Sequence, residues 1–228
     1  MGGNLYVVGT PIGNLSDLSI RAKDTLALVD LIAAEDTRVT KVLLNYYNIK
    51  TSITSYHEKN EIYKAEKLID DILLGKNIAL VSDAGTPCIS DPGYRLVNLA
   101  RLKDIKTIII PGPCAATSAL SISGLPTDHF YFEGFLPLKK GRKTRFQMLE
   151  RLPATIIIYE SPLRVLRTLA DIEKYWGDRI VSICREMTKI YEENFMGNIS
   201  ESISHFKKSK LKGEFVILVA KENYKITE

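Results

Sequence analysis

Residues 78–93 read Ile78-Ala79-Leu80-Val81-Ser82-Asp83-Ala84-Gly85-Thr86-Pro87-Cys88-Ile89-Ser90-Asp91-Pro92-Gly93. The first four residues are apolar and predict a buried strand. Residues 94–100 predict a helix, with Asp91 as its N-cap and Pro92 as its first residue. The loop between strand and helix is longer than the roughly 2–6 residues of an ordinary connection. Ligands of open α/β sheets bind beyond the carboxyl ends of the strands, so we expect this loop to contact a ligand.

Strand and helix patterns alternate on both sides of this loop. Further strands are predicted at residues 5–8, 31–34, 52–55, 106–110, 130–133, 155–159, 180–184 and 215–220. Helical patterns lie between most of them, which indicates an α/β protein with a mainly parallel, doubly wound sheet in its first half. Ser200 is the expected cap of a small helix between the last two of these strands. The proline and glycine residues between 126 and 137 mark a change of pattern. We therefore predict two α/β domains, residues 1–127 and residues 128–228.

The composition is that of an ordinary globular protein, with 228 residues, 45% hydrophobic and 25% charged. The net charge of +4 permits a nucleic-acid partner without requiring one. Cys88, Cys114 and Cys184 show no CxxC spacing, which favours a reducing compartment over a disulfide framework or a zinc site. The apolar runs are too short to span a membrane, and a strand begins at Leu5, which argues against a signal peptide. We expect a cytoplasmic protein that uses neither a membrane nor a metal.

Two more loops rich in glycine and proline follow predicted strands. They are Gly9-Thr10-Pro11-Ile12-Gly13-Asn14 and Pro111-Gly112-Pro113-Cys114-Ala115-Ala116. Parallel strands end at one edge of their sheet, so these loops and residues 82–93 can share one ligand site. Taken one at a time, each loop is better explained as a tight turn. None matches GxGxxG or GxxxxGK[ST], so the usual dinucleotide and nucleoside-triphosphate sites lack support.

Charged residues follow two other strands at the same edge, in Glu35-Asp36-Thr37-Arg38 and His57-Glu58. Two carboxylates beside an arginine suit acid–base chemistry or a charged substrate. They equally suit the start of a helix that Thr37 would cap. His57 could act as a base or contact RNA, although a solvent-exposed loop histidine is the more common case.

The densest basic segment is Lys139-Lys140-Gly141-Arg142-Lys143-Thr144-Arg145. Because lysine and arginine make most contacts to nucleic-acid phosphates, this segment is a candidate RNA-binding surface. The alternative is an ordinary solvent-exposed helix face. Arg185 and Lys189 follow a later strand, where they could face a ligand or pair with neighbouring acids.

In combination, these motifs resemble the tetrapyrrole methylase superfamily of S-adenosylmethionine-dependent methyltransferases, in particular its branch acting on small-subunit ribosomal RNA. The matching segments run in order over nearly the whole chain: residues 9–15, 35–38, 57–58, 82–93, 111–113, 123–126, 134–137, 160–162, 185–186 with Lys189, and 213–215. The resemblance implies two α/β domains, the second with a mixed sheet. It also implies a methyl donor bound in the cleft between the domains, and usually a homodimer.

The resemblance further implies which residues line the donor site. Those expected to bind S-adenosylmethionine are Pro11, Ser82, Asp83, Ala84, Gly85, Thr86, Ile89, Ala115, Ala116, Tyr159 and Gly213. The implied substrate is a cytidine ribose 2′-hydroxyl in small-subunit ribosomal RNA, presented as free RNA or in the assembled subunit. The residues expected to contact this RNA are Arg38, Lys139, Lys140, Arg142, Lys143, Arg145, Arg185 and Lys189. The candidates for a base that accepts the hydroxyl proton are Asp36, His57 and Glu133.

Two other functions remain open at this point: methylation of a corrin or porphyrin precursor on the same scaffold, and a non-catalytic RNA-binding assembly factor. The basic segment and residues 35–38 favour RNA, and the donor loops favour an enzyme. The chain departs from the family pattern at Cys114, where a serine is expected after Pro113. A thiol is a weaker hydrogen-bonding group than a hydroxyl, so any donor contact at this position would be weaker.

Overall fold

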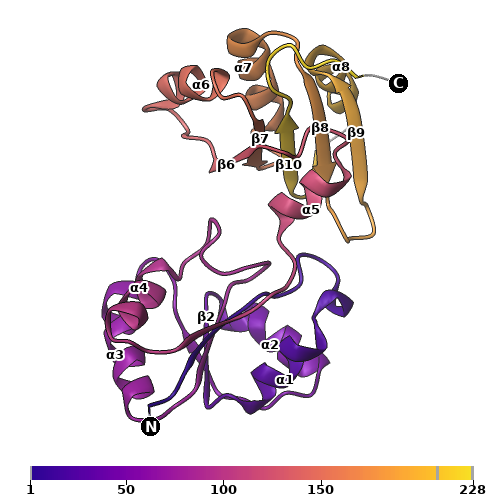
Figure 1. The fold of residues 1–228 in the computed structure, drawn as a ribbon. Coiled ribbons are helices and arrows are strands. Elements are labelled where there is room, and N and C mark those ends of the chain that lie inside the picture. Colours follow the sequence, from indigo (N-terminus) through magenta and orange to yellow (C-terminus); the bar gives the residue numbers. More distant parts are fainter. Residues whose placement is uncertain (1, 209–210, 227–228) are drawn as a thin grey trace. The chain divides into compact units, whose positions relative to one another are not determined.

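The computed structural model describes residues 2–208 and 211–226 (Figure 1). Contacts between residues divide the chain into two compact units, Met1–Cys114 and Ala115–Glu228. Each unit is built on one sheet with helices, as the predicted α/β class requires. The sequence placed the domain boundary after residue 127, whereas the contacts place helix α5 (Ala115–Ile122) with unit 2 because it packs on strands of that unit.

Unit 1 contains a parallel sheet with the strand order β3-β2-β4-β1-β5. Its strands are β1 (Leu5–Val8), β2 (Leu31–Ala34), β3 (Ile53–Ser55), β4 (Ile78–Val81) and β5 (Thr107–Ile110). Its helices are α1 (Ile20–Leu28), α2 (Thr37–Tyr46), α3 (Glu61–Leu73) and α4 (Tyr94–Leu102), with a 3₁₀ turn at Leu15–Asp17. The order and direction of the strands confirm the parallel, doubly wound sheet.

The side chains of β4 explain why helices cover both faces of this sheet. Ile78 and Leu80 join the core that contains α3 and α4, whereas Ala79 and Val81 join the core that contains α1 and α2. All four side chains are buried. Successive side chains of a strand point to opposite faces, so a strand covered on both faces is apolar throughout. Figure 1 shows the two helix pairs on opposite sides of the sheet.

The register of unit 1 brings the carboxyl ends of its strands to one edge. Val8 at the end of β1 pairs with Ile110 at the end of β5, and Ala34 at the end of β2 pairs with Val81 at the end of β4. The loops that the sequence assigned to a ligand site leave the sheet directly after these residues. We call this edge of unit 1 the loop edge.

Unit 2 contains a mixed sheet with the order β6-β7-β10-β8-β9, in which only β6 and β7 run parallel. Its further strands are β6 (Phe130–Phe135), β7 (Thr155–Glu160), β8 (Ile180–Arg185), β9 (Glu193–Asn198) and β10 (Phe215–Val219). Its other helices are α6 (Arg142–Glu150), α7 (Val165–Trp176) and α8 (Ile199–Phe206). The mixed sheet agrees with the family resemblance. Its core includes the aromatic residues Phe146, Trp176, Phe206 and Phe215.

Several local expectations were wrong. Strand β9 was not predicted, because its two large apolar residues, Phe195 and Met196, are adjacent and the other four residues are polar or glycine, so no alternation is visible. Helix α4 begins at Tyr94, and its N-cap is Gly93 rather than Asp91. Gly93 has a φ of 141°, and a Cβ there would lie 2.7 Å from the sulfur of Cys88, so the loop stays irregular up to this glycine.

The caps of two other helices also differ from the prediction. Asp36, not Thr37, is the N-cap of α2, and its carboxylate accepts a hydrogen bond from the backbone N–H of Arg38. Asn198, not Ser200, caps α8 in a capping box with Glu201. In both cases an Asx residue just before the expected cap takes its place, which is consistent with the strong preference of Asp and Asn for N-caps.

Candidate functional site

The three glycine- and proline-rich loops of unit 1 meet at the loop edge. Thr10 and Gly85 form an isolated antiparallel bridge, with the N–H of Thr10 donating to the carbonyl of Gly85 at 2.9 Å and the reverse bond at 3.1 Å. The hydroxyl of Thr86 donates to the carbonyl of Pro113 at 3.1 Å. The loops after β1, β4 and β5 are thus joined to one another, and the predicted convergence is confirmed.

Two glycines allow the first and third loops to come this close. A Cβ on Gly9 would lie 2.8 Å from the backbone nitrogen and Cα of Gly112, and a Cβ on Gly112 would lie 2.8 Å from the carbonyl oxygen of Gly9. Real Cβ contacts do not reach such distances without a shift of backbone. Both positions therefore require glycine for packing, independently of any ligand.

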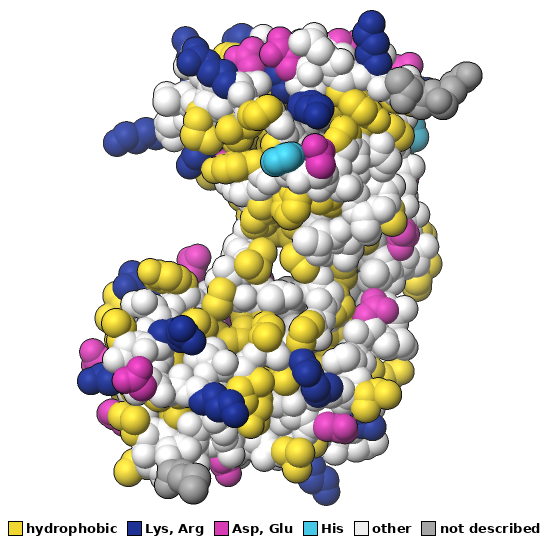
Figure 2. Space-filling view, in the orientation of Figure 1, with side chains coloured by type: hydrophobic (Ala, Val, Ile, Leu, Met, Phe, Trp, Pro, Cys, Tyr) yellow, Lys and Arg dark blue, Asp and Glu magenta, His cyan; other side chains and the backbone are white. Residues whose placement is uncertain are grey.

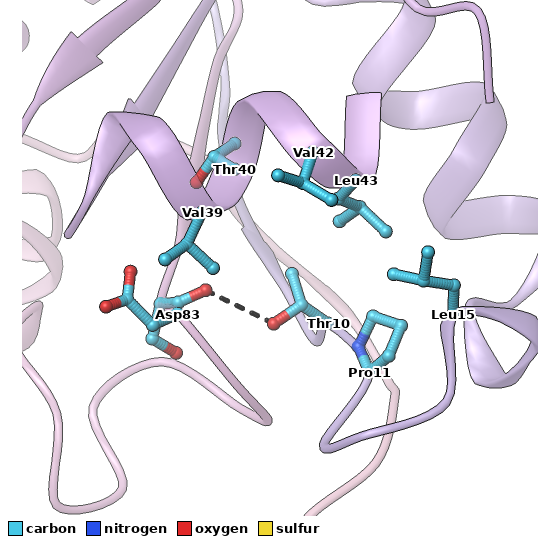
Figure 3. Close-up of a pocket in the computed structure, with 9 residues that line it drawn as sticks. Thr10, Pro11, Leu15, Val39, Thr40, Val42, Leu43 and Asp83 are labelled. Atoms are coloured by element: carbon cyan, nitrogen blue, oxygen red, sulfur yellow. Dashed lines mark hydrogen bonds between the residues drawn. The ribbon is translucent and has the colours of Figure 1, made fainter. Parts of the chain in front are cut away.

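A pocket of about 220 Å³ opens beside these joined loops (Figure 3). One wall comes from the loop after β1, with Thr10 and Pro11, and from the start of the loop after β4, with Ser82 and Asp83. The other wall comes from α2. The full lining is Thr10, Pro11, Leu15, Val39, Thr40, Val42, Leu43, Ser82 and Asp83. The hydroxyl of Thr10 donates to the carbonyl of Ser82 at 3.2 Å, so it braces the two loops (Figure 3). The pocket is mostly apolar with one carboxylate, a composition that suits a small organic ligand with a charged group.

The loop after β2 is held by the loop after β4 through a carboxylate. The backbone N–H of Asp36 donates to Oδ1 of Asp83 at 2.8 Å, and the N–H of Asp83 lies 3.4 Å from Oε2 of Glu35. Asp36 in turn accepts bonds from the guanidinium of Arg38, at 3.0 Å from Nε to Oδ1. Hydrogen bonds from Arg38 lower the pKa of Asp36 to about 2, so this carboxylate is a weak proton acceptor. Arg38 itself is highly exposed.

In contrast to Asp36, the carboxyl groups of Asp91 and Glu35 have raised pKa values. Burial is the largest cause that raises the pKa of Asp91, to about 6, and the charges of Glu35 and Asp83 add to it. Burial first, and then the charge of Asp83, likewise raises the pKa of Glu35. The loop edge therefore gathers carboxyl groups of quite different proton affinity.

His57, the second base candidate, has polar neighbours within its own loop. Its Nε2 lies 3.3 Å from the side-chain nitrogen of Asn60, and its backbone N–H donates to the side-chain oxygen of the same residue at 2.9 Å. Its Nδ1 is buried and has no hydrogen-bond partner among the described residues. The ring is therefore positioned by Asn60 and is not a freely solvated side chain.

Three of the residues expected to bind the donor from unit 2 lie together. The backbone N–H of Ala116, in the first turn of α5, donates to the hydroxyl of Tyr159 at 2.9 Å, and Ala115 directly precedes Ala116. The Tyr159 ring packs edge-on against Phe132 and Phe135, with centroids 5.0 and 5.8 Å away. The tyrosine is thus held between α5 and β6.

Gly213 lies in a separate charged cluster of unit 2. It has a φ of 89°, and a Cβ there would lie 2.3 Å from the side chain of Glu186. Glu186 accepts from Lys189 at 2.9 Å, and Lys189 also pairs with Glu214. Arg185 pairs with Glu193 at 2.9 Å. Arg185 and Lys189 therefore have acidic partners, which is the surface-pairing alternative that the sequence left open.

Glu133, the third base candidate, lies at an irregularity in β6. The register with β7 shifts between Phe132 and Gly134, so Glu133 occupies a bulge. Its side chain is only 5% exposed and pairs with Arg145 at 3.1 Å. Burial raises the pKa of Glu133 while the charge of Arg145 lowers it, and burial is the larger effect. Arg145 thus has a structural partner in addition to its predicted RNA contact.

The basic segment divides into exposed and buried members. Lys139, Lys140 and Lys143 are exposed, whereas Arg142 is only 6% exposed. The guanidinium of Arg142 pairs with Asp171 at 2.8 Å and donates to Thr168 at 2.9 Å. The expectation that Arg142 contacts RNA is therefore wrong, because its donors are already used inside unit 2. The sequence did not predict the burial of Arg142, because Arg142 lies within a run of charged residues.

The sequence reasoning missed several residues of these sites. The pocket wall from α2, with Val39, Val42 and Leu43, was visible only as the apolar positions of a helix. Glu160 was noted only as part of a motif, yet its buried carboxylate accepts bonds from Arg164 and Thr168. The apolar periodicity of a helix could have indicated the first, but no sequence signal distinguishes a buried glutamate from an exposed one.

Within residues 2–208 and 211–226, no group of three or more His, Cys, Asp or Glu side chains is arranged to hold a metal ion. No described helix is long and apolar enough to cross a membrane.

Comparison with protein families gives a match to the tetrapyrrole (corrin/porphyrin) methylases over residues 4–202. The chain belongs to this family. The methylase is 51% identical to the ribosomal RNA small subunit methyltransferase I of Thermotoga maritima, over 96% of this chain and 98% of that protein. It is 47% identical to the protein of the same name from Escherichia coli O157:H7, over 99% of this chain and 80% of that protein.

Solved structures of lower sequence similarity show the same fold. A diphthine synthase superposes on this methylase with a TM-score of 0.76 at 13% identity, covering 97% of this chain and 90% of that chain. The methyltransferase CobJ superposes with a TM-score of 0.71 at 16% identity, covering 99% of this chain and 97% of that chain. At these identities the likeness concerns the fold alone.

The raised pKa of Asp91 predicts a pH-dependent effect of its substitution. The folded state holds the Asp91 proton more tightly than the unfolded chain, so this group destabilises the methylase as pH rises from about 4 to about 6. We expect Asp91→Asn to raise the free energy of unfolding by about 1 kcal/mol at pH 8, after allowance for partial exposure, and to have little effect at pH 3.5. Urea unfolding at both pH values measures this. Asp24→Asn, on the exposed surface of α1, is the control, and an equal effect of Asp91→Asn at both pH values would contradict the prediction.

Proposed function

We propose that this chain is an S-adenosylmethionine-dependent methyltransferase that methylates the 2′-hydroxyl of a cytidine ribose in small-subunit ribosomal RNA. The observation that carries the proposal is the 51% identity, over nearly the full length of both chains, to a ribosomal RNA small subunit methyltransferase I. The joined loops at the loop edge support it, because a mostly apolar pocket with one carboxylate, Asp83, opens beside them. The proposal places the protein in the cytoplasm with ribosomal RNA or the assembled small subunit as its partner. The expected homodimer stays a prediction.

The residues of the loop edge fit a small methyl donor. Gly85 has a φ of 81°, and Asp83 and Ala84 beside it are exposed, so backbone and carboxylate are both accessible to a ligand. The neighbouring pocket is apolar, and Pro11 and Ser82 line it. S-adenosylmethionine supplies an activated methyl group on a sulfonium. Asp83 would attract its positive charge, and the apolar wall would exclude water. Residues Thr86, Ile89, Ala115, Ala116, Tyr159 and Gly213 stay predicted donor contacts.

The chain's main catalytic task is to hold the 2′-oxygen in line with the activated methyl. Positioning of this kind can lower a barrier by about 7–11 kcal/mol. The hydroxyl must also lose its proton. Among the three candidate bases, Asp36 is the weakest, since Arg38 holds its pKa at about 2. We propose Glu133 as the best fit, because burial raises its pKa and Arg145 can hold it in place.

The exposed lysines of the basic segment are the proposed RNA-binding surface. Lys139, Lys140 and Lys143 are all solvent-exposed around the N-terminal end of α6. Figure 2 shows lysine and arginine side chains projecting from the part of unit 2 where Figure 1 places α6. Lysines in this setting can contact phosphates without losing a partner inside the protein. Arg38 in unit 1 is a further exposed candidate.

Binding of S-adenosylmethionine tests the enzyme proposal directly. We expect isothermal titration calorimetry to give a micromolar dissociation constant, equivalent to about −8 kcal/mol, and we expect the Asp83→Ala/Gly85→Val variant to lose this binding. Valine at residue 85 is incompatible with its positive φ, and alanine at residue 83 removes the carboxylate. Asp70→Ala/Gly2→Val, in the same unit, is the matched control. Absence of binding by the intact protein, with and without RNA, would favour the non-catalytic RNA-binding function.

Single-turnover methylation tests the proton acceptor. We expect Glu133→Gln to slow methyl transfer by about 10²- to 10⁴-fold without changing donor affinity, since it removes a base while keeping the shape of the side chain. Asp36→Ala and His57→Ala are measured in parallel, with Glu173→Gln on α7 as the control. Unchanged rates for all three candidates would show that positioning alone carries the reaction.

The salt dependence of RNA binding tests the basic surface. We expect the Lys139→Ala/Lys140→Ala/Lys143→Ala variant to bind a small-subunit RNA fragment more weakly. The slope of log affinity against log salt should fall by about 2, because each lost contact to a single-stranded phosphate removes about 0.7. The exposed lysines 67, 103 and 106 of unit 1, replaced together, form the control. An unchanged slope would mean that the lysines at residues 139–143 are only a solvated surface.

A further inference from the structure

Three consecutive backbone carbonyls in unit 2 are each held by a different arginine. Directly after β6, the carbonyl of Leu136 accepts from Arg164 at 2.7 Å, that of Pro137 from Arg142 at 3.1 Å, and that of Leu138 from Arg167 at 3.2 Å. We call Arg142, Arg164 and Arg167 the arginine clamp. The clamped residues immediately precede Lys139 and Lys140 of the proposed RNA-binding surface.

Ion pairs and hydrogen bonds to acidic and hydroxyl groups of β7 and α7 hold two of the clamp arginines, Arg142 and Arg164. Arg142 pairs with Asp171 at 2.8 Å and donates to Thr168 at 2.9 Å. Arg164 pairs with Glu160 at 2.9 Å, and the hydroxyl of Thr168 donates to the same carboxylate at 2.7 Å. The network therefore connects both arginines through shared partners.

Arg142 is the central member of the clamp. Arg142, Thr168 and Glu160 are each less than a tenth exposed, whereas the Arg167 side chain is 57% exposed. A buried charge is costly unless it is paired and its hydrogen bonds are satisfied. Each of the three nitrogens of the Arg142 guanidinium donates to a different group, namely Asp171, Pro137 and Thr168, so these bonds fix the orientation of the side chain.

The clamp acts on a short turn in which Leu136 is anchored in the core of unit 2, whereas Leu138 is exposed. Gly134 precedes this turn with a φ of 68°, and Gly141 follows it with a φ of 80° and no neighbour within 4 Å of a Cβ position. Pro137 has no N–H to donate, so its carbonyl is the backbone group through which this residue can be held. The backbone N–H of Arg142 also donates to the carbonyl of Lys139 at 3.2 Å. Arg142 thus holds the turn at two carbonyls, that of Pro137 through its side chain and that of Lys139 through its backbone N–H.

We propose that Arg142 is a positioning residue for RNA binding: it fixes the turn at residues 136–140 so that Lys139 and Lys140 meet RNA phosphates in a set geometry. The inference rests on the proposed RNA-binding function and deepens it. It replaces the direct phosphate contact expected for Arg142 with an action through the two lysines. A rigid turn costs less ordering entropy on binding than a flexible one.

The test is a double-mutant cycle on RNA affinity. Arg142→Gln, Lys139→Ala/Lys140→Ala and their combination are titrated with one small-subunit RNA fragment at several salt concentrations. We expect Arg142→Gln to weaken binding at least about five-fold and to lower the salt slope, and we expect the lysine substitutions to add little more in its presence. Donor affinity stays unchanged. Arg142→Lys keeps the charge but not the three-way fork, so it should not restore binding.

Matched variants keep the outcome decisive. Arg21→Gln removes an exposed arginine that donates to a backbone carbonyl in unit 1, at 3.1 Å to Ile109, and serves as the control. If Arg142→Gln does not fold, Arg167→Gln loosens the turn from its exposed side and should show a smaller effect of the same kind. Full effects of the lysine substitutions with none from either arginine variant would overturn the clamp proposal alone. No effect of the lysine substitutions in the wild-type background would overturn the RNA-binding proposal for this segment, and the clamp proposal with it.

Discussion

The close approach of backbone at Gly9 and Gly112 is the constraint on which the loop edge depends. With any side chain at either position the loops after β1 and β5 would be pushed apart by their own atoms. Because they meet, the loop after β4 can bridge to both, through Thr10 and Gly85 on one side and through Thr86 on the other. The small residues of these loops therefore serve packing first, and the accessible backbone beside the pocket is a result of that packing.

The charged residues of the two units have different structural roles. In unit 1 the carboxylate of Asp83 accepts from the backbone N–H of Asp36, and that of Glu35 lies beside the backbone N–H of Asp83. The carboxylate of Asp36 is held by Arg38. In unit 2 Arg142, Arg164 and Arg167 hold backbone carbonyls, while Lys139, Lys140 and Lys143 are exposed to solvent. Arginine suits the first role because its planar fork can satisfy several acceptors at once, and lysine suits the second because its ammonium is strongly hydrated.

The sequence predicted the parts of the fold that rest on periodicity. The apolar run of β4 and the loops after β1, β4 and β5 were all identified, because a strand buried on both faces leaves a continuous apolar signal. Strand β9 was missed, because an edge strand with half-exposed side chains does not leave such a signal. The role of Arg142 was also mispredicted, since burial of a charge depends on partners such as Asp171 and Thr168 that lie 26 or 29 residues away along the chain.

The place of β10 in unit 2 bears on the order in which the chain can fold during translation. All strands of unit 1 precede residue 115, and contacts close that unit on itself, so it can fold as soon as its residues leave the ribosome. Unit 2 is different, because its central strand, Phe215–Val219 between β7 and β8, is made only after both of these neighbours. Until it arrives, β7 and β8 expose unpaired edges that invite association with other chains. The newly made protein therefore passes through a stage in which unit 1 can be folded while the sheet of unit 2 still lacks its central strand.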